Sequence, residues 1–276
     1  MDGTSANLSS GTIGVIPAGN ASNYTATFDT VGQLGPMAVP FSFSAGDDQN
    51  LSGHNSIGIA NISGSISGTA VANRTVTATS ADFGFVHAVA AVSKPTTLST
   101  TSGDDNHATR VTVPNAGADA NGISVTGGSN PTFNDNSVTD NRSVGGTFTA
   151  IGTKNGALTL TTTGEGLSGE SPVNPTVSYT AQVYSGKAQW NVTGSGSWST
   201  HTNWKDTQLG GPNGGAPGVS GISGDTATFG SIISAPSVIT LDAPATLSAL
   251  QFDSINAYTL DGTSPSTLTL QAVPSP

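Results

Sequence analysis

The two glutamates are the residues whose type and spacing could best support catalysis. Glu165 and Glu170 are the only glutamates of the chain, and both lie in one loop rich in glycine and serine. A glycosidase needs two carboxyl groups about 5–10 Å apart, and two glutamates in one loop could meet that requirement. The alternative, which we favour, is that both are solvated loop residues.

Aspartates recur where the C-terminal part of the chain turns. They are Asp225, Asp242, Asp253 and Asp261. Each lies next to a short apolar run, and an aspartate carboxylate can accept a hydrogen bond from the backbone of its own turn. We therefore interpret these four as turn residues, with a catalytic role as the less favoured alternative.

Three loops carry oxygen ligands of the kind that Ca²⁺ prefers. They are Asp47-Asp48, Asp104-Asp105-Asn106 and Asn134-Asp135-Asn136. None of them matches the EF-hand loop or the glycine-rich calcium repeat. We therefore predict no cofactor and no metal ligand, and keep a calcium ion bound by one of these loops as an open alternative.

Motifs for nucleophilic catalysis and phosphate binding are missing from the sequence. The chain has no cysteine, which excludes thiol catalysis and cysteine-ligated metals. It has no G-x-S-x-G motif and no P-loop. The four histidines form no HExxH pair, and we interpret them as ordinary strand or surface residues: His54, His87, His107 and His201. We predict that the chain is not an enzyme.

The three tryptophans lie close together in the sequence. Trp190, Trp198 and Trp204 are the only ones in the chain. Exposed aromatic rings can stack on sugar rings, so these residues are candidate glycan contacts. The alternative, which we favour, is that they cover the first turn of a stacked β structure, whose end would otherwise be open to water.

The composition favours strands and excludes some classes of protein. Gly, Ser and Thr number 36, 36 and 39 of 276 residues, and charged residues make up 9%, against roughly 25% in ordinary domains. Gly, Ser and Thr are poor helix formers. A net charge of −10 with seven scattered basic residues excludes a nucleic-acid binder that neutralises phosphates. No apolar run is long enough to predict a membrane span.

Apolar side chains alternate with threonine or serine along many short runs, as in half-buried antiparallel strands. The runs include 24–31, 39–44, 74–78, 110–113, 147–151, 157–161 and 176–184. Turn clusters separate the runs, and Asn155-Gly156 is a pair that favours a hairpin. Short strands at this spacing are typical of a β-sandwich or barrel.

One segment resembles a known family of Ig-like domains. It extends from Ala81-Asp82-Phe83-Gly84 to Gly164-Glu165-Gly166-Leu167 and is similar to the β-sandwiches called choice-of-anchor D domains. The opening DFG and the closing LTLTTTGEGL carry the resemblance. Such domains occur in tandem in long bacterial surface proteins. The resemblance implies an Ig-like sandwich at 79–184, and a weak partial repeat suggests a partial or degenerate sandwich at 1–78.

A second segment, 189–270, resembles the start of an autotransporter-associated β-strand repeat region. The order and spacing of short pieces carry this resemblance: Trp190-Asn191, Gly196-Ser197-Trp198, Asn203-Trp204, 224–230, 239–242, 250–252 and 258–260. Such regions occur in autotransporter passengers and in proteins sorted by a PEP-CTERM tail. The resemblance implies a right-handed parallel β-helix that ordinarily continues for further turns.

The sequence therefore predicts an all-β protein: Ig-like sandwiches at 1–78 (partial) and 79–184, then the tryptophan-capped start of a β-solenoid at 185–276. We expect a non-catalytic structural or stalk segment of an exported bacterial cell-surface protein, which could also make adhesive contacts. The alternative is a carbohydrate-binding or accessory module of a secreted polysaccharide-degrading protein. The N-terminus carries no signal-peptide pattern, so we interpret the chain as a fragment. Its expected partners are further domains of the same longer chain and surface glycans.

Overall fold

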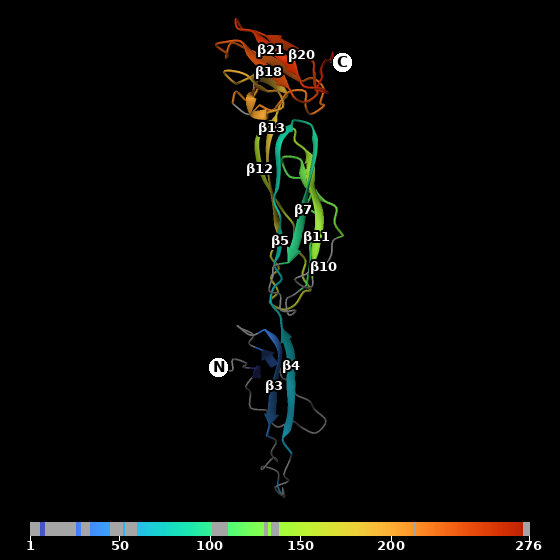
Figure 1. The fold of residues 1–276 in the computed structure, drawn as a ribbon. Helices are drawn as coiled ribbons and strands as arrows, with labels where there is room; N and C mark the ends of the chain where they lie inside the picture. The colour runs from blue at the N-terminus through green and yellow to red at the C-terminus, as the bar shows by residue number, and fades with distance from the viewer. Residues whose placement is uncertain are drawn as a thin grey trace.

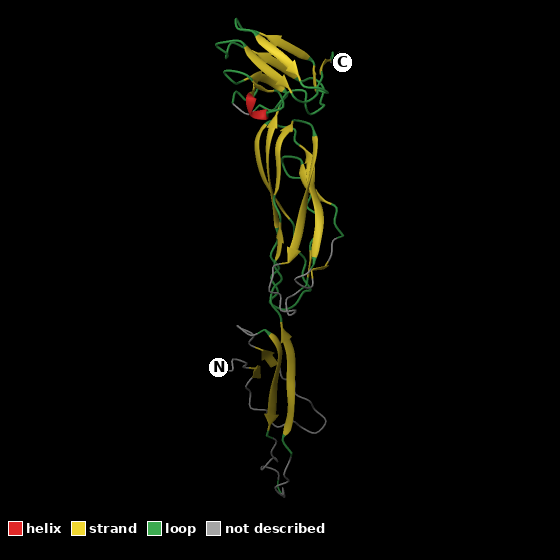
Figure 2. Ribbon diagram, viewed as in Figure 1, coloured by secondary structure: helices red, strands yellow, loops and turns green. Residues whose placement is uncertain are grey.

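The structure is a computed structural model that describes residues 6–8, 26–28, 34–44, 52, 60–100, 110–129, 132–133, 138–211 and 214–272. Over these residues the chain is all β, and the one helical element is a single 3-10 turn, η1 (His201–Asn203). No helix in the described ranges is long and apolar enough to cross a membrane. Figures 1 and 2 show an elongated chain with the N-terminal strands at one end and the C-terminal strands at the other.

The described residues of the N-terminal part include two antiparallel strand pairs. β1 (Ala6–Leu8) pairs with β2 (Ala26–Phe28), and β3 (Gly35–Phe43) pairs with β4 (Ile62–Ala70) along its whole length. In β4 only Ala70 is buried. On β3, Met37 is also buried.

The middle part contains two sheets. One has the order β5 (Val76–Ala78), β7 (Ala91–Thr100), β11 (Thr139–Thr147) and β9 (Ile123–Thr126), with every neighbour antiparallel. The other has the order β12 (Gly152–Thr159), β13 (Thr176–Tyr184) and β6 (Ala81–His87), in which β6 runs parallel to β13. A short pair, β8 (Val111–Thr112) and β10 (Thr132–Phe133), adds Val111 and Phe133 to the buried core.

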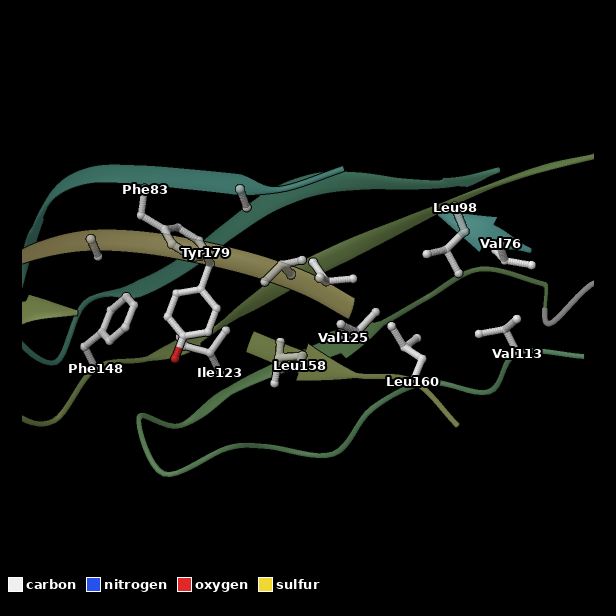
Figure 3. Packing of buried hydrophobic residues seen from close by; sticks show 14 of the residues in the cluster. Val76, Phe83, Leu98, Val113, Ile123, Val125, Phe148, Leu158, Leu160 and Tyr179 are labelled. Carbon is white, nitrogen blue, oxygen red and sulfur yellow. The ribbon is translucent and has the colours of Figure 1, made fainter. Parts of the chain in front are cut away.

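One cluster of buried apolar side chains draws on both sheets of the middle part (Figure 3). Leu98 comes from β7, Leu158 from β12 and Tyr179 from β13. Along β13 buried and more exposed residues alternate. The strand predicted at 176–184 from its apolar–polar alternation is confirmed, because that alternation places every second side chain in the core.

The first strand of the middle part, β5, lies within the run predicted at 74–78. It pairs with β7 and buries Val76 in the core cluster. The strand predicted at 147–151 is wrong beyond Thr147. There the carbonyl of Phe148 accepts a hydrogen bond of 2.8 Å from Val89 N–H, in the turn that follows β6.

The Asn155-Gly156 pair lies in the middle of β12 rather than in a hairpin turn. Gly156 is opposite Tyr179 of β13. A Cβ at this position would lie 2.1 Å from Cζ of the Tyr179 ring. The hairpin prediction is therefore wrong, because this glycine makes room for an aromatic ring and does not form a turn.

The C-terminal part is built from three small sheets that the chain visits in rotation. β14 (Lys187–Trp190), β17 (Thr226–Phe229) and β20 (Ala249–Phe252) are parallel, and β16 (Trp204–Asp206) pairs antiparallel with β14. β15 (Gly196–Ser197), β18 (Ser237–Leu241) and β21 (Tyr258–Gly262) form a second parallel sheet. β19 (Ala245–Leu247) and β22 (Leu268–Leu270) form the third.

The register of these sheets repeats along the chain. Thr226 pairs with Ala249, Val238 with Thr259, and Ala245 with Leu268, which gives turns of 23, 21 and 23 residues. The last turn is more exposed than the turn before it. Leu247 of β19 is 1% exposed, whereas Leu270, its direct partner in β22, is 62% exposed.

Candidate functional site at the junction of two units

Glu170 and Glu165 have separate structural partners. The Glu170 carboxylate accepts hydrogen bonds from the backbone N–H groups of Glu165, Gly166 and Leu167, at 3.0, 2.7 and 3.0 Å. The Glu165 carboxylate forms a surface ion pair of 2.8 Å with Arg110. Glu170 is thus more than a solvated loop residue, because its carboxylate holds the loop in shape.

The three tryptophans lie in the core of the C-terminal unit. Their exposed fractions are 1% for Trp190 and 0% for Trp198 and Trp204. The Trp204 ring meets the Trp198 ring edge-on, with centroids 4.7 Å apart. The indole N–H of Trp198 donates to the Pro217 carbonyl at 3.0 Å. The premise that these indoles are exposed for sugar stacking is therefore wrong, because other side chains and the backbone occupy their surroundings.

Asp242 connects two successive turns of the C-terminal unit. Its carboxylate accepts hydrogen bonds from the backbone N–H and the hydroxyl of Ser199, at 2.9 and 2.7 Å, and from the hydroxyl of Ser197. Burial alone would raise the pKa of Asp242, but these hydrogen bonds outweigh it and lower the pKa to about 2. The serines before and after Trp198 are thereby tied to the following turn.

The middle and C-terminal units are joined by a very short link. β13 ends at Tyr184 and β14 begins at Lys187, so only Ser185 and Gly186 lie between them (Figure 1). Asp206 is fully buried and accepts hydrogen bonds from the Ser185 backbone N–H and hydroxyl, at 2.6 and 2.9 Å. The first residue of the link is therefore fixed by a carboxylate of the C-terminal unit.

An ion pair lies beside the second residue of the link. Nε2 of His87, the last residue of β6, is 2.8 Å from Oδ1 of Asp225, the residue before β17, and both side chains are buried. Gly186 has a φ of +77°, and a Cβ there would lie 2.0 Å from Asp225 Oδ1 and 2.6 Å from His87 Nε2. A glycine at this position lets the chain pass directly over the ion pair.

The geometry around His87 favours the doubly protonated ring. Its Nδ1 faces the Ala88 carbonyl and its Nε2 faces Asp225. A carbonyl and a carboxylate only accept, so both contacts are satisfied as hydrogen bonds when each ring nitrogen carries a hydrogen. Burial alone would lower the pKa of His87. The hydrogen bond and the charge of Asp225, together with the hydrogen bond to the Ala88 carbonyl, outweigh burial and raise the pKa. The positive charge of Lys187 opposes this rise in the pKa to a smaller extent.

His201 lies at the same junction in the opposite charge state. Its ring stacks on Phe85 of β6 with centroids 4.7 Å apart and planes 7° apart. Its Nδ1 accepts a hydrogen bond of 2.9 Å from the Ala216 backbone N–H, which requires an unprotonated nitrogen. Burial lowers the pKa of His201. The junction therefore holds one charged and one neutral imidazole.

A cavity of about 430 Å³ opens at this junction. Its lining includes Phe85, His87, Tyr184 and His201, with Lys94 of β7 also lining it. The Tyr184 ring lies edge-on to His87, with centroids 5.2 Å apart, and burial raises the pKa of Tyr184 to about 12. The cavity gives solvent a path toward His87.

Several predicted sites fall elsewhere. The three candidate calcium loops at 47–48, 104–106 and 134–136, together with His54 and His107, lie outside the described residues. Over the part of the chain that the structure does describe, no group of three or more His, Asp or Glu side chains could hold a metal ion.

The sequence does not predict this junction. His87 and Asp225 are 138 residues apart, and the turn-residue interpretation of Asp225 is wrong, because its side chain is buried against another unit. One signal was available: His87 interrupts an otherwise apolar run, 83–92. A polar side chain in such a run needs a buried hydrogen-bonding partner.

No family model and no curated protein matches the chain. Among solved structures, one match is the structure of the Vibrio cholerae VesB protease, with 15% sequence identity and a TM-score of 0.29. The match covers 40% of this chain and 32% of the protease chain. A likeness this weak carries no argument about fold or activity.

Proposed function

We propose that the chain is a non-catalytic stalk segment of an exported bacterial cell-surface protein. The observation that carries the proposal is the join between the middle and C-terminal units. Its link has two residues, Ser185 and Gly186, and buried carboxylates lie against both. A stalk must keep the orientation of successive units, which a short buried link can do and a flexible linker cannot.

The proposal includes a finer assignment of each unit. We propose an Ig-like β-sandwich for the middle part, supported by its two sheets and shared core and by the resemblance to choice-of-anchor D domains. We propose the start of a right-handed parallel β-helix for the C-terminal part, supported by three parallel sheets with turns of 21–23 residues. The antiparallel pairs of the N-terminal part support a partial sandwich.

The surface location rests on the two resemblances and on composition. Few charges, no cysteine and abundant Ser and Thr suit extended β architecture outside the cell. Partners would be further domains of the same longer protein, and adhesive contacts with surface glycans would add to the stalk function.

Two measurements test this proposal. Small-angle X-ray scattering of the whole chain should give a rod-like profile whose maximum dimension does not change with salt, and a compact profile would contradict the stalk. Antibodies raised against the chain should label intact cells of the organism that encodes it. Labelling only after permeabilisation would contradict export.

A glycan array separates the stalk from the carbohydrate-binding alternative. With Trp190, Trp198 and Trp204 buried, a glycan would have to use other contacts. We expect no strong binding to the array by the whole chain. Strong, saturable binding to one class of glycan would favour the alternative instead.

A further inference from the structure

We propose that the junction between the middle and C-terminal units is a pH-sensitive brace, in which protonated His87 holds the two units in one orientation and its deprotonation lets them reorient. The inference rests on the geometry of the junction and does not depend on where the protein resides.

The brace spans two units that are otherwise joined by a short link. His87 ends β6 of the middle unit, and Asp225 precedes β17 of the C-terminal unit. Their contact of 2.8 Å is buried, with exposed fractions of 6% and 1%. The other Asp225 oxygen accepts a hydrogen bond of 2.6 Å from the Gly218 backbone N–H. The carboxylate is therefore anchored within its own unit, and His87 connects it to the other.

Loss of one proton disrupts this arrangement, because a neutral imidazole has only one N–H. Either the Ala88 carbonyl or the Asp225 carboxylate then faces a ring lone pair. Asp225 also loses the cation beside it while it stays buried, and an unpaired buried charge is strongly unfavourable. Reorientation of the two units would relieve this by letting water reach the carboxylate.

The other charged and titratable groups around His87 do not replace its charge. Lys187 of β14 donates to the Gly224 carbonyl, and Lys94 of β7 lies on the cavity wall with an exposed side chain. Tyr184 of β13 meets His87 through its ring edge. His201 of η1 is held neutral by the Ala216 N–H. Within the described ranges, these are the charged and titratable groups, besides Asp225, that the cavity lining, the ring contacts and the electrostatics place around His87.

The remaining contacts across the junction keep the two units together when His87 loses its proton. The stack of Phe85 on His201 carries no charge, and Ser185 and Gly186 keep the units connected. The cavity beside His87 gives the ring solvent access. Deprotonation should therefore widen the range of orientations rather than unfold either unit.

Distances between two spin labels on the whole chain test the proposal. The chain has no cysteine, so Ser178→Cys in β13 and Ile255→Cys, at a position that is 99% exposed, give unique sites on the two units. Double electron–electron resonance should give one narrow distance distribution below pH 6.5, the ordinary histidine pKa. The distribution should broaden as the pH rises through the higher pKa of His87.

Two variants identify the residue responsible. His87→Gln removes the titratable ring, and its distance distribution should not change with pH. The matched control, His201→Phe, keeps an aromatic ring on Phe85 and should retain the native response. A native distribution that stays constant throughout the titration would overturn the proposal, and so would a native pH response that persists in His87→Gln.

A measurement on the unmodified chain keeps the test decisive if His87→Gln does not fold. Nitrogen-15 NMR of the histidine rings should show both His87 nitrogens protonated above pH 6.5. A His87 ring that loses its proton at or below that pH would overturn the proposal.

Discussion

At the scale of single residues, aspartate carboxylates connect distant segments of this chain, from buried positions at Asp206 and Asp225 and from an exposed position at Asp242. Asp206 holds Ser185, Asp225 pairs with His87, and Asp242 connects Ser197 and Ser199 to the next turn. From the sequence, Asp225 and Asp242 were interpreted as local turn residues, with a catalytic role as the less favoured alternative, and Asp206 was not singled out. Their distant partners could not be predicted, because each partner depends on the order in which the strands pair.

Gly186→Ala tests whether the link must pass directly over the ion pair. A Cβ would lie 2.0 Å from Asp225 Oδ1, so we expect a loss of about 2–4 kcal/mol from overlap and backbone strain together. Urea denaturation of the whole chain measures it. Gly221→Ala is the matched control, since Gly221 has a φ of +74° and open space around its Cβ position. Equal losses in both variants would show that backbone strain alone matters.

The two junction histidines should give opposite pH dependences of stability. The raised pKa of His87 means that its contribution is complete below pH 6.5 and is lost as the pH rises through the higher pKa. The lowered pKa of His201 means that its contribution is complete above pH 6.5 and is lost as the pH falls through the lower pKa. Together they favour a stability maximum near pH 6.5.

Difference measurements isolate these contributions from those of other groups. The free energy of unfolding of the native chain, minus that of His87→Gln, should shrink as the pH rises above 6.5. The same difference for His201→Phe should shrink as the pH falls below 6.5. If both differences change in the same direction with pH, the assigned charge states are wrong.

At the scale of elements, alternation of apolar and polar residues identified strands well and their partners poorly. β13 matches its predicted range of 176–184, because burial of one face leaves a clear period of two. The parallel order of β14, β17 and β20 was expected from the spacing of the short strands and from the family resemblance, and not from alternation. The hairpin predicted at Asn155-Gly156 is wrong, because the same glycine that suits a turn also admits a ring across a strand pair.

Gly156→Ala tests that role of glycine in β12. Its Cβ would overlap the Tyr179 ring, so we expect a loss of about 1–3 kcal/mol in the free energy of unfolding. A double-mutant cycle with Tyr179→Leu provides the control, because the smaller side chain leaves room for the Cβ. The combined loss should be smaller than the sum of the single losses. Strictly additive losses of stability would show that Gly156 is not needed to make room for the Tyr179 ring.

Trp198→Ala tests the structural role of the tryptophans in the C-terminal unit. Removing a fully buried indole should lower the free energy of unfolding by about 3–5 kcal/mol. Urea denaturation monitored by circular dichroism measures this loss. Phe252→Ala is the control, since Phe252 is 52% exposed in the last turn and should cost much less. Comparable losses in the two variants would contradict a core centred on the tryptophans.

At the scale of the whole molecule, the all-β class is the part of the sequence-based prediction that the structure confirms. Abundant Gly, Ser and Thr excluded helices, and local periodicity needs no knowledge of distant contacts. The junction had only a partial local signature, since the apolar run around His87 indicates a buried partner for its ring but does not identify Asp225, which lies 138 residues away. The contacts that join the units therefore include one between residues 138 positions apart.

The rotation of the chain through three sheets has a consequence for the evolution of its length. Inserting or deleting one residue in a strand would turn every inward side chain outward, whereas a whole turn of 21–23 residues preserves the register. Each additional turn would add one strand spacing of about 4.8 Å. The length of such a unit can therefore change only by whole turns, and duplication of turns would change it in equal small steps.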